Sequence, residues 1–563
     1  MNRRRFLGAL AGAAYFRPAM ARSAPFPVKF RKQLPYEPLY RFIEPGHDEF
    51  SGEKEAFEIA AHLKRLPATG KLPLAPEFQG ISPFPVRYTQ VAEGVQQAEY
   101  NQADTQFETG LAAWLRSLGN IRAARFFVLP EDAIRYEVAS DLGRGAHYRV
   151  GVWKQKWSGG RLTHFAPVEE TVVTSRPLFQ DITSYSLAGS SAFEQQLRRG
   201  VPYWRARLDS ACGIDVYGNN GIAVGDIDGD GWDEIYVCQP GGLPNRLFKN
   251  DGRGRFTDIT EPAGVGVLDA TASALFVDFR NTGRQDLIVL RGSGPLLFLN
   301  QGDGTFRLKA DAFRFSSAPQ GTFTGMAAAD YDRDGRVDLY LCCYVYFQSE
   351  DQYQYPVPYY DARNGPPSFL FHNEGDGVFR DATAEAGLNA DNHHFSFAAA
   401  WCDYDGDGWP DLYVANDFGR KSLYKNDRGK FRDIADAAGV KDTGPGMSAA
   451  WFDYDGDGRP DLYVSNMWTD AGQRVTREKD FSPNLAANDA YRRHAKGNSL
   501  FRNRGDGTFE ETDSVEGVQM GRWAWSADGI DFDNDGAPEI LIATGMLTNS
   551  SEKDLTSFFW RQV

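Results

Sequence analysis

Aspartates that alternate with other residues are the side chains with the clearest chemistry in this chain. In one segment they occupy positions 1, 3, 5 and 9, namely Asp403, Asp405, Asp407 and Asp411. Alternate spacing turns the side chains toward one centre, where four carboxylates repel one another unless a cation lies among them. Calcium suits such a loop best, because it takes many oxygen ligands in a flexible geometry. Trp409, at position 7, offers its backbone carbonyl as a further ligand.

Four more segments follow the same pattern and predict four more calcium sites. Each has acids at positions 1, 3, 5 and 9, with Glu instead of Asp at position 9 in two of them. Each also offers the backbone carbonyl of position 7. The predicted ligands are Asp226, Asp228, Asp230, Trp232 and Glu234; Asp330, Asp332, Asp334, Arg336 and Asp338; Asp453, Asp455, Asp457, Arg459 and Asp461; and Asp531, Asp533, Asp535, Ala537 and Glu539. A single loop of this kind is also compatible with a solvated turn. Recurrence in register favours the metal site.

A sixth copy departs from the pattern. After Asp278 it has Arg280 at position 3 and Thr282 at position 5, before Asp286 closes the loop. We therefore expect no calcium there, and expect Arg280 to supply the positive charge by pairing with Asp278 or Asp286. An EF-hand is excluded as the setting of these loops, because position 12 of the Asp403 loop is Val414 instead of a bidentate glutamate.

The loops belong to an internal repeat of 50 to 52 residues, measured from Asp226 to Asp278 to Asp330 and from Asp403 to Asp453. Each unit has an apolar strand, the acidic loop, a second strand, a third strand that ends in Asn, a Gly-rich turn and a fourth strand. Four antiparallel strands in about fifty residues are one blade of a β-propeller. We count six blades, and a degenerate seventh between residues 184 and 221 stays open. Longer gaps hold insertions near residues 344–366 and 467–497.

Two further segments bear on the closure of the ring. The sixth copy ends soon after its second strand, and residues 557–560 are a candidate for its third. Residues 179–183 match the fourth-strand pattern although they precede the first full repeat. We predict that they pair with the last blade, because closure removes an exposed sheet edge.

The repeat resembles the FG-GAP repeats of integrin-type propellers, also called VCBS-like repeats, over residues 175–545. With its export signal and N-terminal region, the arrangement resembles bacterial homologues of cartilage acidic protein, without the C-terminal ASPIC/UnbV domain that they usually carry. The resemblance implies binding in the cell envelope or outside the cell, and it implies no reaction.

The N-terminus predicts export. A basic start, a short apolar run and an Ala19-Met20-Ala21 cleavage pattern indicate a signal peptide over residues 1–21. Arg3-Arg4-Arg5-Phe6-Leu7 resembles the twin-arginine motif, which addresses folded proteins for export. The expected location is the periplasm, the cell envelope or the medium.

Residues 25–175 lack the repeat and predict a separate α+β region ahead of a propeller over residues 176–563. Helices are expected at residues 53–66 and 105–118, and strands at 122–129, 133–139, 147–157 and 162–168. A helix followed by a curved antiparallel sheet resembles the cone-shaped domain of nuclear transport factor 2-like proteins. The whole chain is therefore expected to be mainly β.

Composition excludes several classes of protein. The net charge of -15 argues against a nucleic-acid partner, which needs a basic surface. The mean hydropathy of -0.47 argues against membrane spans. Five cysteines are an odd number and do not indicate a disulfide framework. We expect buried thiols, with Cys342-Cys343 as a redox or metal pair left as an alternative.

Two functions from different classes remain. The leading one is a calcium-stabilised binding or scaffold protein that holds a glycan or protein partner on the face with the insertions. It rests on six tyrosines, which alternatively pack the insertion onto its blade: Tyr344, Tyr346, Tyr353, Tyr355, Tyr359 and Tyr360. The rival is a secreted enzyme similar to a polysaccharide lyase, with His393, His394 and Arg522 as candidate residues. No catalytic residue is assigned, and the sequence does not disclose the oligomeric state.

Overall fold

The computed structural model describes residues 48–141, 145–175, 179–199, 203–204, 221–346, 356–477 and 485–545. The chain divides into a unit of residues 1–56 and a unit of residues 57–563, which holds almost all described elements. The predicted signal peptide, Cys212 and the candidate strand at residues 557–560 lie outside the described residues. No helix among the described residues is long and apolar enough to cross a membrane.

The N-terminal region is a mixed sheet with two helices, as the pattern of its residues predicts. The helices are α2 (Asp48–Thr69) and α3 (Phe107–Ser117). The strands are β1 (Leu74–Gly80), β2 (Arg87–Ala92), β3 (Val95–Glu99), β4 (Asn120–Val128), β5 (Ala133–Asp141), β6 (Ala146–Ser158) and β7 (Arg161–Ser175). They pair in the order β2-β3-β7-β6-β5-β4, and β1 runs parallel to β7. Strands β1, β2 and β3 were not predicted, because their residues show little alternation between buried and exposed positions.

A buried carboxylate lies at the centre of this sheet. Glu170 accepts hydrogen bonds from Trp114 Nε1 at 2.7 Å and from the Tyr136 hydroxyl at 2.6 Å. Its other oxygen accepts from the Tyr88 hydroxyl at 2.6 Å and from Arg149 at 3.2 Å. Because one cation and three neutral donors surround Glu170, its burial is compensated inside the sheet. The group therefore fixes the packing of α3 against the strands.

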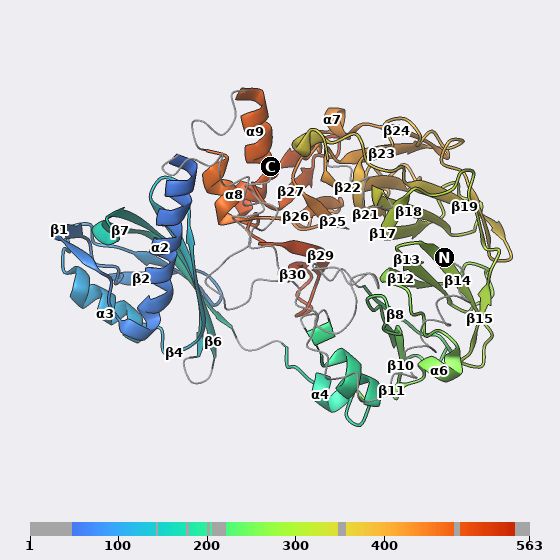
Figure 1. Ribbon diagram of the computed structural model, residues 1–563, viewed down its shortest axis with the longest axis horizontal. Coiled ribbons are helices and arrows are strands. Elements are labelled where there is room, and N and C mark those ends of the chain that lie inside the picture. The colour runs from blue at the N-terminus through green and yellow to red at the C-terminus, as the bar shows by residue number, and fades with distance from the viewer. Residues whose placement is uncertain are drawn as a thin grey trace, which may run out of the picture. The chain divides into compact units, whose positions relative to one another are not determined.

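Six small antiparallel sheets follow, which we call blades 1 to 6 in chain order (Figure 1). Blade 1 is β8 (Ile222–Gly225), β9 (Glu234–Val237), β10 (Arg246–Asn250) and β11 (Phe256–Asp258); blade 2 is β12 (Thr271–Val277), β13 (Asp286–Arg291), β14 (Gly294–Asn300) and β15 (Phe306–Lys309). Blade 3 is β17 (Gly321–Ala329), β18 (Asp338–Tyr346), β19 (Phe369–Gly375) and β20 (Val378–Asp381), with β16 (Phe313–Arg314) parallel to β20.

The last three blades complete the series. Blade 4 is β21 (Phe395–Cys402), β22 (Asp411–Phe418), β23 (Ser422–Asp427) and β24 (Lys430–Asp433). Blade 5 is β25 (Gly446–Phe452), β26 (Asp461–Asn466), β27 (Ser499–Asn503) and β28 (Phe509–Glu511), and blade 6 is β29 (Ala524–Ile530) with β30 (Glu539–Thr544). The first strands contact one another in succession, from β8 through β12, β17, β21 and β25 to β29. This is the mainly β, propeller-type architecture that the repeat predicts, and the number of blades in a closed ring stays a prediction.

The core lies between consecutive sheets. Most apolar clusters combine strands of one blade with strands of the next. Tyr413 and Leu423 of blade 4, for example, pack with Val464 and Phe501 of blade 5; Phe501 is 1% exposed and the other three are fully buried. Each blade is therefore stabilised mainly by its neighbours, as in other repeat architectures.

A short helical turn follows the fourth strand in several blades. These turns are α6 (Thr260–Ala263), α7 (Ala435–Ala438) and α10 (Asp513–Glu516). Each ends on a glycine in the left-handed region, with φ between 71° and 78° at Gly264, Gly439 and Gly517. The Ala-Gly pair that closes most repeat units is therefore the C-terminal end of such a turn.

In blades 2 to 5, an asparagine at the end of the third strand joins the blade to the preceding one. Asn426 Nδ2 donates to the Tyr331 carbonyl of blade 3 at 2.8 Å and to the Pro410 carbonyl of its own loop at 2.9 Å. The same cross-blade bond is made by Asn300 to Ile227, by Asn373 to Phe279 and by Asn503 to Tyr404. All four asparagines are at most 2% exposed. The recurring Asn of the sequence is thus a bond between blades.

Residues 179–182 do not form the predicted fourth strand. They lie outside the described strands, and the helical turn α4 (Thr183–Ser186) follows. The turn nevertheless resembles those of complete blades, because Asp181 Oδ1 accepts from the Thr183 backbone N–H at 2.9 Å, as Asp258 does from Thr260 at 3.0 Å. Blade 6 has only two described strands, so this segment has no third strand among them to pair with.

The segment still contacts blade 6. The ring of Phe179 packs edge-on against Phe532 in the acidic loop of that blade, with ring centroids 4.9 Å apart. Tyr331 and Phe431 make the equivalent contact between blades 3 and 4, at 5.7 Å. Phe179 therefore occupies the place of a fourth-strand aromatic residue, although it is 68% exposed.

The described tyrosines of the first insertion are half-buried and pack against neighbouring side chains, in agreement with the alternative interpretation. Tyr344 donates to Asp417, and its ring lies 5.5 Å from that of Phe397. Tyr359, in the short helix η5 (Tyr359–Asp361), contacts Phe418 at 4.6 Å. Tyr353 and Tyr355 lie outside the described residues.

The two insertions meet on one side of the propeller region. The second insertion contains α8 (Asp470–Val475) and α9 (Leu485–His494), and α9 contacts η5 of the first. The Tyr360 and Tyr491 rings are 5.0 Å apart, and those of Tyr359 and His494 are 5.2 Å apart. We call the surface formed by η5, α8 and α9 the insertion face.

The four cysteines that the structure describes are free thiols, as predicted. Cys238, Cys342 and Cys343 are free and buried, and Cys402 is free and half-buried. Burial raises the pKa of Cys238 and of Cys402 to about 12, so both stay protonated at neutral pH. Vicinal Cys342-Cys343 is therefore a pair of core residues.

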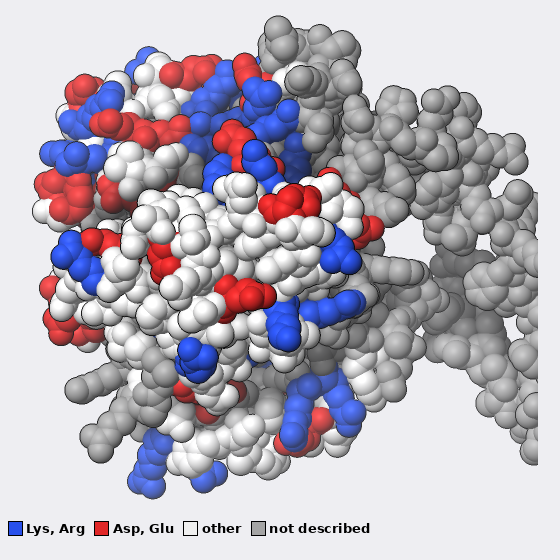
Figure 2. All heavy atoms as spheres, turned by 90° about the vertical axis from the view of Figure 1, so that its left-hand side faces the viewer, with Lys and Arg blue, Asp and Glu red and all other residues white. Residues whose placement is uncertain are grey.

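Figure 2 shows acidic and basic side chains interspersed around a largely uncharged area on the face turned to the viewer. Among the described residues visible there, basic groups alternate with acidic ones along the upper edge. The described residues on this face therefore carry side chains of both signs next to one another.

The bond between blades 3 and 4 can be tested by changing Asn426. Asn426→Ala removes both bonds of the side-chain amide and leaves the Tyr331 and Pro410 carbonyls without that donor. We expect a loss of about 2 to 4 kcal/mol in the free energy of unfolding in denaturant. Asn250→Ala in blade 1 is the matched control, because among the described residues Asn250 donates only within its own loop, to Asp233 at 3.2 Å. Equal losses in both variants would contradict the cross-blade role.

Candidate metal sites

The acidic loops join the first and second strands of their blades and share one backbone geometry. In each predicted calcium loop, the position-1 carboxylate accepts the backbone N–H groups of positions 5 and 6. In the Asp403 loop these bonds come from Asp407 at 3.0 Å and from Gly408 at 2.8 Å. Gly408 has a φ of 87°, which glycine adopts without strain. The other loops repeat both bonds at 2.8 to 3.2 Å.

The ninth-position acid is buried and holds three parts of the blade together. Asp411 is fully buried and accepts the backbone N–H of Asn426 on the third strand at 2.7 Å. Its second oxygen, Oδ2, has no hydrogen-bond partner among the described residues. Asp338 and Asp461 are equally buried and also accept from their third-strand asparagines at 2.7 Å. A buried carboxylate oxygen that lacks a donor points to a missing cation.

The carboxylates of a loop converge on one centre. In four of the predicted loops, three acids offer oxygens that all lie within 4.8 Å of one another. These groups are Asp226, Asp228 and Asp230; Asp330, Asp332 and Asp338; Asp403, Asp405 and Asp411; and Asp453, Asp455 and Asp461. Calcium binds oxygens at 2.3 to 2.6 Å, so a single ion fits among oxygens at this spacing.

Burial disfavours the charged form of the ninth-position carboxylates. Burial raises the pKa of Asp338 to about 8, that of Asp411 to about 7 and that of Asp461 to about 6. The neighbouring acids of the same loop raise the pKa further, and the backbone donors lower it. The charged form is therefore poorly compensated by the chain alone, which is what a metal ion would correct.

Basic side chains from the third strand contact the acids of three of the described loops. In blade 5, Arg502 Nε lies 2.6 Å from Asp455. Lys425 Nζ is 2.6 Å from Asp405, 2.7 Å from Asp407 and 3.6 Å from Asp411. Lys249 occupies the same place in blade 1, in contact with Asp228 and 2.9 Å from Asp230. The ammonium group among three acids occupies the place where a metal ion would bind. The acids of the loop are therefore arranged to hold a positive charge.

The Asp278 loop carries its own cation, as predicted. Arg280 Nη2 and Nε donate to the two oxygens of Asp286 at 2.8 and 2.9 Å, and Nη2 also donates to the Asn300 carbonyl at 3.0 Å. Asp286 is fully buried and is the ninth-position acid of this loop. Of the two predicted partners, Asp286 receives the guanidinium, whereas Asp278 accepts backbone N–H groups from Thr282 and Gly283.

The position-7 residues take part through their backbone N–H groups. Trp232, Arg336, Trp409, Arg459 and Ala537 each donate to the position-5 carboxylate of their loop at 2.8 to 3.0 Å. Their carbonyls as metal ligands stay a prediction. In the Asp531 loop, burial and the charges of Asp535 and Glu539 raise the pKa of Asp533.

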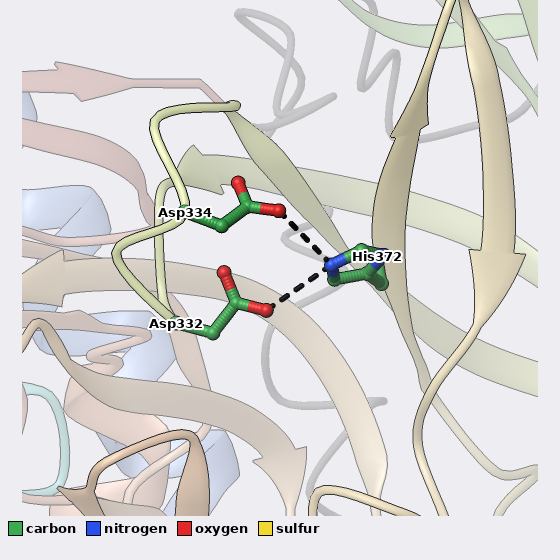
Figure 3. A group of neighbouring side chains, drawn as sticks. All are labelled: Asp332, Asp334 and His372. Atoms are coloured by element: carbon green, nitrogen blue, oxygen red, sulfur yellow. Dashed lines mark ion pairs between the residues drawn. The ribbon is translucent and has the colours of Figure 1, made fainter.

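One residue near the metal loops was missed from the sequence. His372, on the third strand of blade 3, stands where Lys249 and Lys425 stand in blades 1 and 4. Figure 3 shows its ring turned toward Asp332 and Asp334 of the loop between β17 and β18. Nε2 lies 3.1 Å from Asp332 and 3.3 Å from Asp334. The signal was available in the aligned third strands, where His replaces Lys or Arg.

The repeats match a known family. A model of the FG-GAP-like repeat matches residues 226–289, 278–341, 362–414, 403–464 and 485–542. Each matched range contains at least one acidic loop, and the Asp278 loop with its arginine is among them. The matched residues cover the six acidic loops and the strands around them.

Two vertebrate proteins, both named cartilage acidic protein 1, are similar to part of this chain. Human cartilage acidic protein 1 is 28% identical over 265 residues, which are 42% of this chain and 36% of that protein. The Xenopus tropicalis protein is 29% identical over 208 residues, which are 36% of this chain and 30% of the relative. The matches thus span about a third of the length of these relatives.

A solved structure is also similar in part. It is that of an Agrocybe aegerita lectin, described as recognising non-reducing terminal N-acetylglucosamine. It matches with 17% identity and a TM-score of 0.36, over 59% of this chain and 76% of the lectin. Five matched repeats, together with the similarity to cartilage acidic protein 1, show that the chain belongs to the FG-GAP-like repeat proteins.

Proposed function

We propose that this chain is an exported binding or scaffold protein whose blades are held folded by calcium in the acidic loops. One observation carries the proposal. The ninth-position acids Asp338, Asp411 and Asp461 are fully buried beside other carboxylates, whereas the sixth loop of the same geometry contains a guanidinium. Each loop thus needs a positive charge at its buried ninth acid, and among the described loops only the Asp278 loop pairs that acid with a positive side chain from within the loop. The leader-like sequence at residues 1–21 supports export.

The ligands for calcium are the acids at positions 1, 3, 5 and 9. Bound calcium would neutralise the buried ninth acid and displace Lys425 and Lys249 from the loop centres. Because the same acid accepts from the third strand, ion binding is coupled to the pairing of three strands. Calcium therefore acts as a structural staple in this proposal and takes no part in a reaction.

A cavity beside the first insertion is the candidate place for a ligand. Its volume is about 300 Å³, which is at the lower end for small-molecule sites. Polar side chains line much of it, among them the exposed Ser316, Ser317, Asn389 and His393. Hydroxyl, amide and imidazole groups bind sugar hydroxyls or the polar groups of a peptide. A glycan or a protein segment is the proposed partner there.

The rival function as a lyase-like enzyme gains no support from the candidate histidines. His394 is 4% exposed, and its Nδ1 lies 2.8 Å from the Ala362 carbonyl. That contact fixes the ring against the first insertion. His393 is exposed and lines the cavity, a position that suits binding as much as catalysis and does not favour the enzyme. We therefore favour binding.

Removal of calcium tests the staple. We expect the melting temperature of the purified chain to fall by about 10 °C or more with a calcium chelator, because several sites each add about 2.7 kcal/mol when free calcium is a hundredfold above Kd. Differential scanning calorimetry with and without chelator measures this. Restoring calcium should restore the melt, and an unchanged melting temperature would contradict the staple.

Changes at Arg280 test the charge requirement within one loop. Arg280→Ala leaves the buried Asp286 unpaired, and we expect it to cost about 3 to 5 kcal/mol in calcium-free buffer. Arg280→Asp recreates acids at positions 1, 3 and 9, so its stability should recover with calcium and its calcium content should rise by one ion per chain. The two variants therefore differ in their response to calcium. An identical response in denaturant titrations would refute the exchange of a guanidinium for a metal.

The cavity is tested by the paired change Asn389→Ala with His393→Ala. We expect at least a tenfold loss of binding to any glycan that the wild-type chain retains on a glycan array, because both side chains are exposed and line the cavity. Lys441→Ala, an exposed change in the segment between blades 4 and 5, is the control and should bind as the wild type does. Retention of binding by the paired variant would place the ligand elsewhere.

A further inference from the structure

Blade 3 carries a nitrogen ligand in a loop that otherwise offers oxygen. Nε2 of His372 and one carboxylate oxygen each of Asp332 and Asp334 lie within 4.8 Å of one another. The nitrogen is 3.1 and 3.3 Å from the two oxygens (Figure 3). Ligand atoms around an ion bound at about 2.1 Å are about 3.0 to 3.4 Å apart in octahedral or tetrahedral geometry. The three side chains are therefore already spaced as one side of a coordination shell.

The replacement of Lys by His changes what the loop can bind. In blade 4, Lys425 occupies the loop centre but cannot bind a metal ion, because its ammonium has no lone pair. An entering ion must push it out. His372, at the same place, presents an imidazole that joins the ligands instead of leaving them. Calcium takes oxygen ligands, whereas imidazole suits transition dications such as zinc.

Two more contacts support a nitrogen ligand here. His372 Nδ1 is buried, has no hydrogen-bond partner among the described residues and lies 3.4 Å from Glu374, to whose same oxygen Arg380 donates at 2.6 Å. The negative charge of this carboxylate behind the ring favours a proton on Nδ1, which leaves the Nε2 lone pair for a metal. In addition, the Oδ1 atom of Asp332 is buried and has no hydrogen-bond partner among the described residues.

We propose that the Asp330 loop is a transition-metal site, in which His372, Asp332 and Asp334 bind a dication of the zinc class in preference to calcium. The proposal rests on the proposed function only in that the acidic loops take metal ions. Arg336, which pairs with Asp334, must move on binding, as Arg459 must in the equivalent calcium loop of blade 5. With calcium as the sole divalent ion, the loop takes calcium through its carboxylates like its neighbours.

Cobalt(II) is the probe, because its visible absorption reports ligand type and geometry. The full chain without an affinity tag is treated with chelator, returned to millimolar calcium and titrated with Co²⁺. We expect one equivalent of Co²⁺ to bind, with a visible spectrum typical of nitrogen ligation, and we expect calcium not to displace it. His372→Lys, which installs the residue of blades 1 and 4, should weaken Co²⁺ binding at least about tenfold. His372→Gln is a second variant with no added charge.

A gain-of-function control completes the design. Lys425→His places an imidazole over Asp405 and Asp407 in blade 4, so this variant should bind a second equivalent of Co²⁺. Melting with and without calcium is measured on every variant, which reports folding and the calcium staple separately. Equal Co²⁺ binding by wild type and His372→Lys, or its complete displacement by calcium in the wild type, would overturn the transition-metal site and leave the calcium staple standing. Loss of calcium-dependent melting in all variants would instead count against the staple alone.

Discussion

A carboxylate that must be both buried and charged is the constraint on which blades 1 to 5 depend. In blades 1, 3 and 5 the ninth-position acid accepts N–H groups from its own loop and from the third strand, so it ties the loop to two strands. It can do so without access to water only if its charge is balanced. The acids at positions 1, 3 and 5 make that balance harder, because they add negative charge around the same centre. We therefore propose that the loop folds in full only with a cation.

The blades meet this constraint with different cations on one backbone. In blade 2 the cation is a guanidinium within the loop, and in blades 1 and 4 a lysine from the third strand lies where an ion would sit. In blade 3 the corresponding residue is a histidine. The backbone hydrogen bonds of the turns hardly differ among these loops. The difference between blades therefore lies in two side chains, the one at position 3 of the loop and the one on the third strand.

Much of this was accessible from the sequence, because spacing determines direction. Alternation at Asp403, Asp405 and Asp407 predicted convergent side chains, and an arginine in the same frame predicted an internal ion pair. The strands around each loop followed from the repeat. Long-range pairing was harder to foresee: the Asn426 bond joins residues 95 positions apart, and nothing in its local pattern shows that its amide reaches the preceding blade.

The sequence misled where local pattern and neighbours disagree. Residues 179–183 have the composition of a fourth strand, but a strand needs a partner, and the described part of blade 6 provides two strands only. For Tyr344 and Tyr359 the sequence left exposure and packing open, and the structure places their half-buried rings against blade 4. Native mass spectrometry of the folded chain in calcium as the sole divalent ion tests the central claim most directly. Five bound ions per chain are predicted, and a folded chain that carries none would contradict the account.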